Sequence, residues 1–383
     1  MQITELEAVP FRLPRRADVR WAGLEMGIGN FVLVRLHTDE GLVGLGEINP
    51  LPDWGGDHGR QGGETQASAC ALMNEILAPA IIGLDPLTRA GVHTAMDRVL
   101  QGHPYIKAAI DIALHDLMGK ATGQPLHALL GGAARPGVVL SHMLGLMEVE
   151  AALHEARRAV EEGVRAFQIK GGIDAERDAA LVRRLRTEFG ADVVLRLDLN
   201  ATKSTAKAAA SALSDVMHLL DFIEQPVTGL TEMSRATQQF AVPVIADESC
   251  WSAHDAAEIV RRRGADALSI YLAKAGGVTG AMHIDVVASL AGMSCDINGG
   301  FESGVGNAAN VHVGMAGRSI DLPCVISATA PSGSTTSEFA GRYYHDDIVA
   351  EPFGYRDGVL TPPPGPGLGV TIDEVRLAAY RCD

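Results

Sequence analysis

The sequence is poor in cysteine, and the few cysteines it has are not spaced as pairs. Only five occur in 383 residues, and none forms a Cys-x-x-Cys motif. An odd number of scattered cysteines disfavours a disulfide framework and a structural zinc site. The chain also lacks a basic, apolar leader and any apolar run long enough to cross a membrane. We therefore expect a soluble cytoplasmic protein with no membrane partner.

Aromatic residues and positive charges are scarce as well. Aromatics make up 5% of the chain against 47% apolar residues in total, so the core must consist mainly of Ala, Val, Leu and Ile. Lys and Arg number 32 against 47 Asp and Glu, which gives a net charge of −15. Such an acidic chain repels a phosphate backbone, and we expect no nucleic acid partner. No His-Glu-x-x-His motif occurs, which disfavours a zinc hydrolase.

The pattern of apolar residues changes near position 138. Before it, residues 31–47 predict a hairpin with a Gly-containing turn, within a strand region over 1–61. Residues 65–120 predict helices, the last of which ends at Gly123. We therefore expect an α+β capping domain over residues 1–125.

After this point, short apolar strands alternate with amphipathic helices. The expected strands are 140–144, 166–170, 194–200, 222–225, 244–247, 267–274, 293–298 and, as a candidate eighth, 320–327. This alternation predicts an α/β fold, a (β/α)8 barrel of the TIM type, over residues 138–330. A doubly wound open sheet is the alternative, but it would place a Gly-rich phosphate loop after its first strand, and none follows Leu144.

The stretch 361–367 is rich in Pro and Gly, so it can form neither a helix nor a central strand. We interpret residues 331–383 as a C-terminal segment that returns to the capping domain and completes it.

Acidic side chains stand at the ends of three consecutive expected strands. These are Asp198, Glu224 and Asp247, which follow one another at intervals of one β/α unit. The carboxyl ends of barrel strands face the active site, so the three side chains should converge. Clustered carboxylates repel one another unless a cation joins them, and oxygen ligands favour a hard ion. Any one of these acids alone would more simply be a helix cap, but three in register predict a Mg²⁺ site.

Lysines end the strands on either side of these acids. Lys170 precedes the three acidic strands and Lys274 follows them. A lone lysine is more often a surface residue that extends its amine into water. A partly desolvated lysine near Mg²⁺, however, has a lowered pKa and can act as a base. The flanking positions favour two acid/base residues that approach the metal from opposite sides.

This set of residues resembles that of the enolase superfamily, muconate lactonizing enzyme subgroup, over essentially the whole chain. The resemblance implies the capping domain, the barrel, the Mg²⁺ ligands and the lysine acid/bases given above. Gln168 departs from the subgroup, which usually has Lys-x-Lys on this strand. The Gln-x-Lys spacing is similar to that of hydroxyproline betaine epimerases. The chain also resembles these epimerases in residues 102–113, 294–296 and 365–369. Members of the subgroup that are similar to cis-3-hydroxyproline dehydratase resemble it as well.

The resemblance also implies where a substrate binds. Glu302 matches the glutamate of the seventh strand, and specificity resides in two capping-domain loops that here contain Trp21 and Trp54. A tryptophan face can hold a cationic ammonium for roughly 0.5–2 kcal/mol, although both rings could simply cover the barrel mouth. Gln168 could hydrogen-bond a substrate carboxylate, and Asp296 is an acid that could meet a substrate ammonium.

The expected chemistry is removal of the proton next to a carboxylate, which gives an enediolate. Return of the proton to the opposite face would racemise or epimerise a proline-type amino acid or betaine, which is our first choice. Loss of a β-hydroxyl would instead dehydrate a 3-hydroxyproline. Cycloisomerisation and o-succinylbenzoate synthesis are further alternatives, as is a barrel that binds without turnover, which the intact acids and lysines argue against. We expect a small carboxylate substrate and a homo-oligomer.

Overall fold

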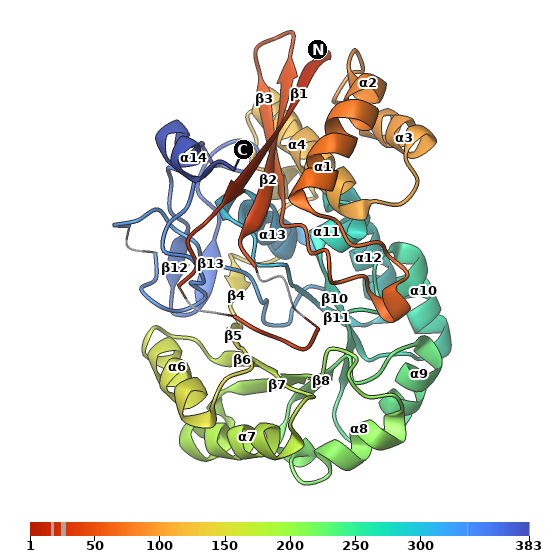
Figure 1. Ribbon diagram of the computed structural model, residues 1–383, viewed down its shortest axis with the longest axis vertical. Helices are drawn as coiled ribbons and strands as arrows, with labels where there is room; N and C mark the ends of the chain where they lie inside the picture. Colours follow the sequence, from red (N-terminus) through yellow and green to blue (C-terminus); the bar gives the residue numbers. More distant parts are fainter. Residues whose placement is uncertain (17–18, 24–27, 335, 383) are drawn as a thin grey trace.

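The computed structural model describes residues 1–16, 19–23, 28–334 and 336–382. Its N-terminal part is an antiparallel sheet of order β1-β2-β3 with helices packed beside it, seen in the upper half of Figure 1. The elements of this part are β1 (Ile3–Arg12), β2 (Asn30–Thr38), β3 (Val43–Ile48), η1 (Asp57–Gly59), α1 (Gln66–Leu72), η2 (Met73–Leu77), α2 (Ala78–Ile81), α3 (Arg89–Val99), α4 (Pro104–Thr122) and α5 (Leu126–Leu129).

The hairpin and the long helix form where the sequence predicts them. β2 and β3 pair antiparallel around a turn in which Gly41 takes a φ of +79°. α4 begins with Pro104 in its first turn and ends at Gly123, whose left-handed backbone closes the helix. Residues 49–61, however, form a loop with one short helical turn rather than a strand. α4 is buried on nearly every side because β3 packs on one face and the barrel on another.

The second part is a parallel sheet whose strands follow one another in chain order, β5-β6-β7-β8-β9-β10-β11. This order has no reversal point, so it is a barrel wall and not a doubly wound sheet. Helices run around its outside, as the lower half of Figure 1 shows. The elements are β4 (Val138–Val139), β5 (His142–Leu144), α6 (Val149–Glu161), β6 (Ala166–Lys170), α7 (Ala175–Phe189), η3 (Gly190–Asp192), β7 (Val194–Asp198), α8 (Ala206–Leu213), η4 (Met217–Leu219), β8 (Phe222–Glu224), α9 (Leu230–Gln239), β9 (Val244–Ala246), α10 (Ala253–Arg262), β10 (Ala267–Ile270), α11 (Leu272–Ala275), α12 (Val278–Ala291), β11 (Ser294–Ile297) and α13 (Gly304–Ala316).

The eighth position of the barrel is filled by residues 319–325, which form single bridges instead of a regular strand. Ile320 and Val325 bridge to β11 and the residue after it, and Cys324 bridges to Leu140 on the other side. The candidate strand over 320–327 is therefore present only as this irregular closing segment.

One predicted strand was too long at its end. β10 stops at Ile270, and Lys274 lies on the short helix α11 instead of on the strand. The apolar run 267–273 contains both elements, and periodicity cannot separate a short buried helix from a buried strand.

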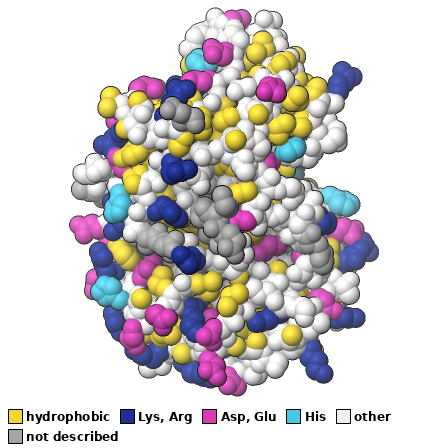
Figure 2. All heavy atoms as spheres, in the orientation of Figure 1, with side chains coloured by type: hydrophobic (Ala, Val, Ile, Leu, Met, Phe, Trp, Pro, Cys, Tyr) yellow, Lys and Arg dark blue, Asp and Glu magenta, His cyan; other side chains and the backbone are white. Residues whose placement is uncertain are grey.

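The C-terminal segment crosses back over both parts. Its elements are β12 (Gly354–Arg356), β13 (Val359–Thr361) and α14 (Glu374–Tyr380). β13 pairs with β4 in a separate three-stranded sheet of order β12-β13-β4, whereas Arg381, just after α14, bridges to Phe11 of β1. Acidic and basic side chains are interspersed around the lower half of the molecule in Figure 2. Within the described ranges, no helix is long and apolar enough to cross a membrane.

Candidate active site

The register of the barrel strands puts Lys170, Asp198 and Glu224 at one level. Lys170 of β6 is paired with Asp198 of β7, and Asp198 is paired with Glu224 of β8. Asp247 follows β9 directly, one residue beyond the strand. All four residues are at most 5% exposed. The structure therefore brings together the acids and the first lysine that the strand ends predicted.

Glu224 is held by two donors that leave one of its oxygens free. Its Oε2 accepts a hydrogen bond from Gln168 Nε2 at 2.7 Å and lies 3.3 Å from the Nε atom of Arg196. Its Oε1 is buried and has no partner. Gln168 Nε2 also lies 3.3 Å from Asp198 Oδ2. Gln168 therefore contacts two of the carboxylates, and it also lines the pocket in which we expected it to meet a substrate.

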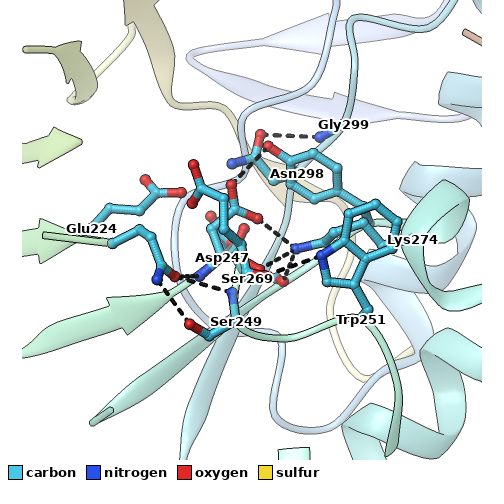
Figure 3. A network of polar contacts seen from close by, with 12 residues as sticks. Glu224, Asp247, Ser249, Trp251, Ser269, Lys274, Asn298 and Gly299 are labelled. Carbon is cyan, nitrogen blue, oxygen red and sulfur yellow. Dashed lines mark hydrogen bonds and ion pairs between the residues drawn. The ribbon is translucent and has the colours of Figure 1, made fainter. Parts of the chain in front are cut away.

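The two lysines lie on opposite flanks of the acids. Lys170 Nζ is 2.5 Å from Asp198 Oδ2, and Lys274 Nζ is 2.5 Å from Asp247 Oδ1. Lys274 also donates to the backbone carbonyls of Asp247 and Ser269, at 2.8 and 3.1 Å. Figure 3 shows Lys274 reaching Asp247 from the side opposite to Glu224. Each lysine thus forms an ion pair with a different acid of the cluster.

Aromatic rings wall the small pocket above these groups. Trp21, Trp54, Tyr271 and Phe301 line it, and its free volume is about 20 Å³, which is room for roughly one water molecule. The Trp21 ring centroid lies 5.5 Å from Lys170 Nζ, whereas those of Trp54 and Tyr271 lie 5.7 and 4.2 Å from Lys274 Nζ. Both predicted tryptophans therefore lie over the lysines, where their faces meet a cation.

Asp296 and Glu302 do not line this pocket. Asp296 is fully buried on β11 and forms an ion pair with Arg196 of β7 across the barrel interior. The expectation that Asp296 meets a substrate ammonium does not fit this placement, because its charge is already matched. Glu302 accepts hydrogen bonds from the Gly300 N–H at 2.9 Å and from Asn310 Nδ2 at 3.3 Å. These contacts connect Glu302 to the turn after β11 and to α13.

Burial and mutual repulsion dominate the electrostatics of the acids. Burial, followed by the charge of Glu224, raises the pKa of Asp198 to about 7. Burial also raises the pKa of Asp247, and the pKa of Glu248 rises well above its usual range for the same reason. Burial opposes the charge on Lys170, but attraction to Asp198 and Glu224 outweighs it and raises the lysine's pKa. The lowered pKa that we predicted applies to a lysine beside Mg²⁺, whereas here the lysine itself balances the acids.

The donor set fits a divalent cation in composition. In the part of the chain that the structure describes, no three His, Cys, Asp or Glu side chains stand ready-arranged around a metal position. The amines and the amide described above occupy several of the carboxylate oxygens instead. Close to the acids, the buried oxygens that lack a partner among the described residues include Glu224 Oε1, Glu248 Oε2 and Asn200 Oδ1. Unpaired buried oxygens are costly, and oxygen-only donors match Mg²⁺. Such an ion would also offset the carboxylate charge that raises the pKa of Lys170.

Several residues of the site were not predicted. Asn200 and Asn298 line the pocket, two positions beyond Asp198 and one beyond β11, so the strand-end rule could have found both. Arg196 lies inside the barrel, and its partners come from strands remote in sequence. Tyr271 follows an apolar strand, and nothing in its sequence context marks it.

Comparison with known families gives full-length matches. Residues 4–131 match the family described as mandelate racemase / muconate lactonizing enzyme, N-terminal domain, and residues 151–376 match the family described as enolase C-terminal domain-like. N-succinyl-L-Arg/Lys racemase of Bacillus cereus is 30% identical over 98% of this chain and 97% of its own. Cis-3-hydroxy-L-proline dehydratase of Roseibium aggregatum is 31% identical, over 97% and 96%.

Solved structures agree with the sequence comparisons. The muconate lactonizing enzyme from Pseudomonas putida superimposes with a TM-score of 0.87 at 27% identity, and the match covers all of both chains. Racemase, dehydratase and lactonizing enzymes are therefore all similar to this chain over its whole length.

Proposed function

Because this chain belongs to the enolase superfamily, in its muconate lactonizing enzyme subgroup, we propose that it epimerises or racemises a proline-type amino acid or betaine. Its relatives are racemases, epimerases, a dehydratase and cycloisomerases, so the protein is an isomerase or a lyase. Membership implies a divalent metal ion, usually Mg²⁺. We assign Asp198, Glu224 and Asp247 as its ligands.

The observation that carries the proposal is the pair of lysines on opposite flanks of the acids. When bound, the metal ion supplies positive charge that offsets the negative charge developing on the substrate carboxylate. A carbon held in the pocket between the amines presents one face to Lys170 and the other to Lys274. One amine removes the proton, and the other, in its protonated form, returns a proton to the opposite face. The configuration of that carbon is thereby inverted.

The residues that line the pocket favour a substrate with one carboxylate and a cationic nitrogen. Apart from Lys170, no cationic side chain lines it among the described residues, so a second substrate carboxylate would lack a partner. The faces of Trp21 and Trp54 attract a cationic nitrogen as they attract the lysine amines. This favours an amino acid or betaine over the dicarboxylates that cycloisomerisation would require.

Dehydration of a 3-hydroxyproline is the second candidate, supported by the full-length likeness to a cis-3-hydroxy-L-proline dehydratase. Both reactions begin with the same proton transfer. They differ in whether one amine then assists loss of the β-hydroxyl on the same face or the other amine returns the proton.

Deuterium exchange at the carbon next to the carboxylate, followed by NMR in D₂O with Mg²⁺, tests the proposal. Lys170→Ala should stop exchange for one stereoisomer of a responsive substrate, and Lys274→Ala for the other. Net epimerisation should fall by roughly 10²–10⁴-fold in both variants, as expected for loss of an acid/base. Lys207→Ala, which removes an exposed lysine of α8, is the matched control.

Two outcomes would contradict the assignment. One is loss of exchange for the same stereoisomer in both lysine variants. The other is full exchange after the metal has been removed with a chelator. Product analysis then separates the two candidates, because dehydration releases a keto acid or imine and epimerisation does not.

A further inference from the structure

The cap loop, which we define as residues 49–65 between β3 and α1, is fastened to the barrel at Asp57. This side chain is 4% exposed, and its Oδ2 accepts a hydrogen bond from Ser249 Oγ at 2.5 Å. Its Oδ1 accepts from the Gly229 N–H at 3.0 Å, and its own N–H donates to the Glu248 carbonyl at 3.0 Å. One residue of the loop is thus bonded to the segments that follow β8 and β9.

The same attachment places an aromatic stack over Lys274. Trp54, three residues before Asp57, stacks on Trp251 with ring centroids 5.3 Å apart. The Trp251 indole donates at 3.1 Å to the Glu248 carbonyl, which also receives the Asp57 N–H. The position of Asp57 therefore fixes the position of Trp54 over the amine.

Ser249, which donates to Asp57, is also hydrogen-bonded to the turn that contains Asp247 through the side chain of Gln225. Ser249 Oγ accepts from Gln225 Nε2 at 2.8 Å. Gln225 Oε1 in turn accepts from the N–H groups of Asp247 and Ser249, at 2.9 and 3.2 Å. Ser249 and Trp251 appear together below Asp247 in Figure 3. The cap loop and an assigned metal ligand therefore share one chain of hydrogen bonds.

We propose that Asp57 is a positioning residue, a latch that holds the cap loop closed over the catalytic centre and sets the turn of Asp247. The closed pocket has room for about one water molecule, so a substrate enters only when the loop lifts. Among the described residues Asp57 has no salt bridge, and its charge is balanced by neutral donors alone. Opening returns this carboxylate to water, which offsets the lost hydrogen bonds and makes the latch reversible. The inference rests on the proposed function only in that the substrate binds in this pocket.

Tryptophan fluorescence tests the latch without any substrate. The chain has three tryptophans, so a Trp21→Phe background leaves only Trp54 and Trp251, which form the stack. Asp57→Ala in this background should increase quenching by acrylamide at least twofold, because the stack becomes accessible. Ser249→Ala removes the partner of the same bond and should also increase quenching. The double variant should add less than the sum of the two single effects, since both changes break the Asp57–Ser249 contact.

Kinetics with a responsive substrate separate positioning from a general loss of structure. Asp57→Ala should raise KM about tenfold with a smaller change in kcat, while circular dichroism and the unfolding midpoint stay near those of the parent. Asp39→Asn, in the hairpin turn, changes the same charge and should leave every reading unchanged.

Unchanged quenching in both Asp57→Ala and Ser249→Ala, or additive effects in the double variant, would overturn the latch. If Asp57→Ala does not fold, acrylamide quenching of the Ser249→Ala variant alone tests the latch. Increased quenching without turnover of any carboxylate would leave the latch standing and refute the proposed function.

Discussion

Glu47 is a buried carboxylate that joins the capping sheet to the barrel. It lies on β3, is 1% exposed, and accepts hydrogen bonds from the backbone N–H and the hydroxyl of Ser303 at the start of α13. A helix N-terminus favours a negative charge, but burial opposes it. Burial is the larger effect and raises the pKa of Glu47 to about 8. The folded protein therefore holds this carboxyl in its protonated form at neutral pH.

This raised pKa predicts a pH-dependent contribution to stability. The folded state binds the proton more tightly than the unfolded state, so the stabilisation is complete below about pH 4.5 and is lost as pH rises through about 8. Glu47→Gln cannot titrate. The free energy of unfolding of the parent, relative to this variant, should fall by a few kcal/mol between pH 4.5 and about 8. Urea unfolding at five pH values measures it, and parallel curves for the two proteins would refute it.

At the scale of elements, β3 and α4 pack with almost no space between them. Gly44 and Gly46 of β3 face α4, and a Cβ at Gly46 would collide with the carbonyl oxygen of Ala109. A Cβ at Gly44 would likewise meet the carbonyl of Ala113. Because the obstructing atoms are helix backbone, no side-chain rotation can relieve the collision. The glycines of this strand therefore set the distance between the sheet and the helix.

Gly46→Ala should destabilise the protein by about 1–3 kcal/mol or more, as expected for overpacking. The urea midpoint would fall accordingly. Gly91→Ala adds the same methyl group on the exposed side of α3, where the nearest neighbouring atom would be the Thr88 methyl at 3.3 Å. This control should be neutral or slightly stabilising, because alanine favours helix over glycine. Equal effects of the two substitutions would contradict the packing argument.

At the scale of the whole molecule, Asp116 of α4 fastens the C-terminal segment to the capping domain. Its Oδ2 accepts from the Leu45 N–H of β3 at 2.8 Å, and its Oδ1 accepts from the Leu368 N–H at 2.9 Å. Lys120 balances the charge at 2.7 Å. One buried carboxylate therefore holds together three segments that are far apart in the chain, and residues 362–369 are kept in place without regular structure of their own.

Asp116→Ala should leave two buried N–H groups without a partner, at a cost of about 1–3 kcal/mol each. The unfolding free energy should drop by roughly 2–6 kcal/mol, and limited proteolysis should cleave the C-terminal segment sooner. Asp85→Ala removes an exposed carboxylate that accepts a hydrogen bond from the nearby Leu87 N–H, and it should have little effect. A variant of Asp116 that unfolds and is cleaved like the parent would show that the fastening is unimportant.

Local patterns in the sequence determined most of the fold. Apolar periodicity and helix-ending glycine are properties of neighbouring residues, so α4 and the strands β6 to β9 lie within a few residues of their predicted places. The same patterns placed Lys170, Asp198 and Glu224 at strand ends, and the register of the barrel then aligned them. A charged residue that ends an apolar strand is visible in the sequence because it interrupts the run.

Only the tertiary structure decided which partner each of the remaining side chains meets. Asp296 pairs with Arg196, 100 residues away, and Asp57 bonds Ser249, 192 residues away. No local pattern records such distances, because they arise when strands and loops remote in sequence converge at one end of the barrel. The same holds for Lys274. The apolar run around it predicted a strand, but in the structure Lys274 lies on the helix α11, which packs against α4. Propensity and periodicity act over a few residues, whereas burial and charge pairing act across the whole chain.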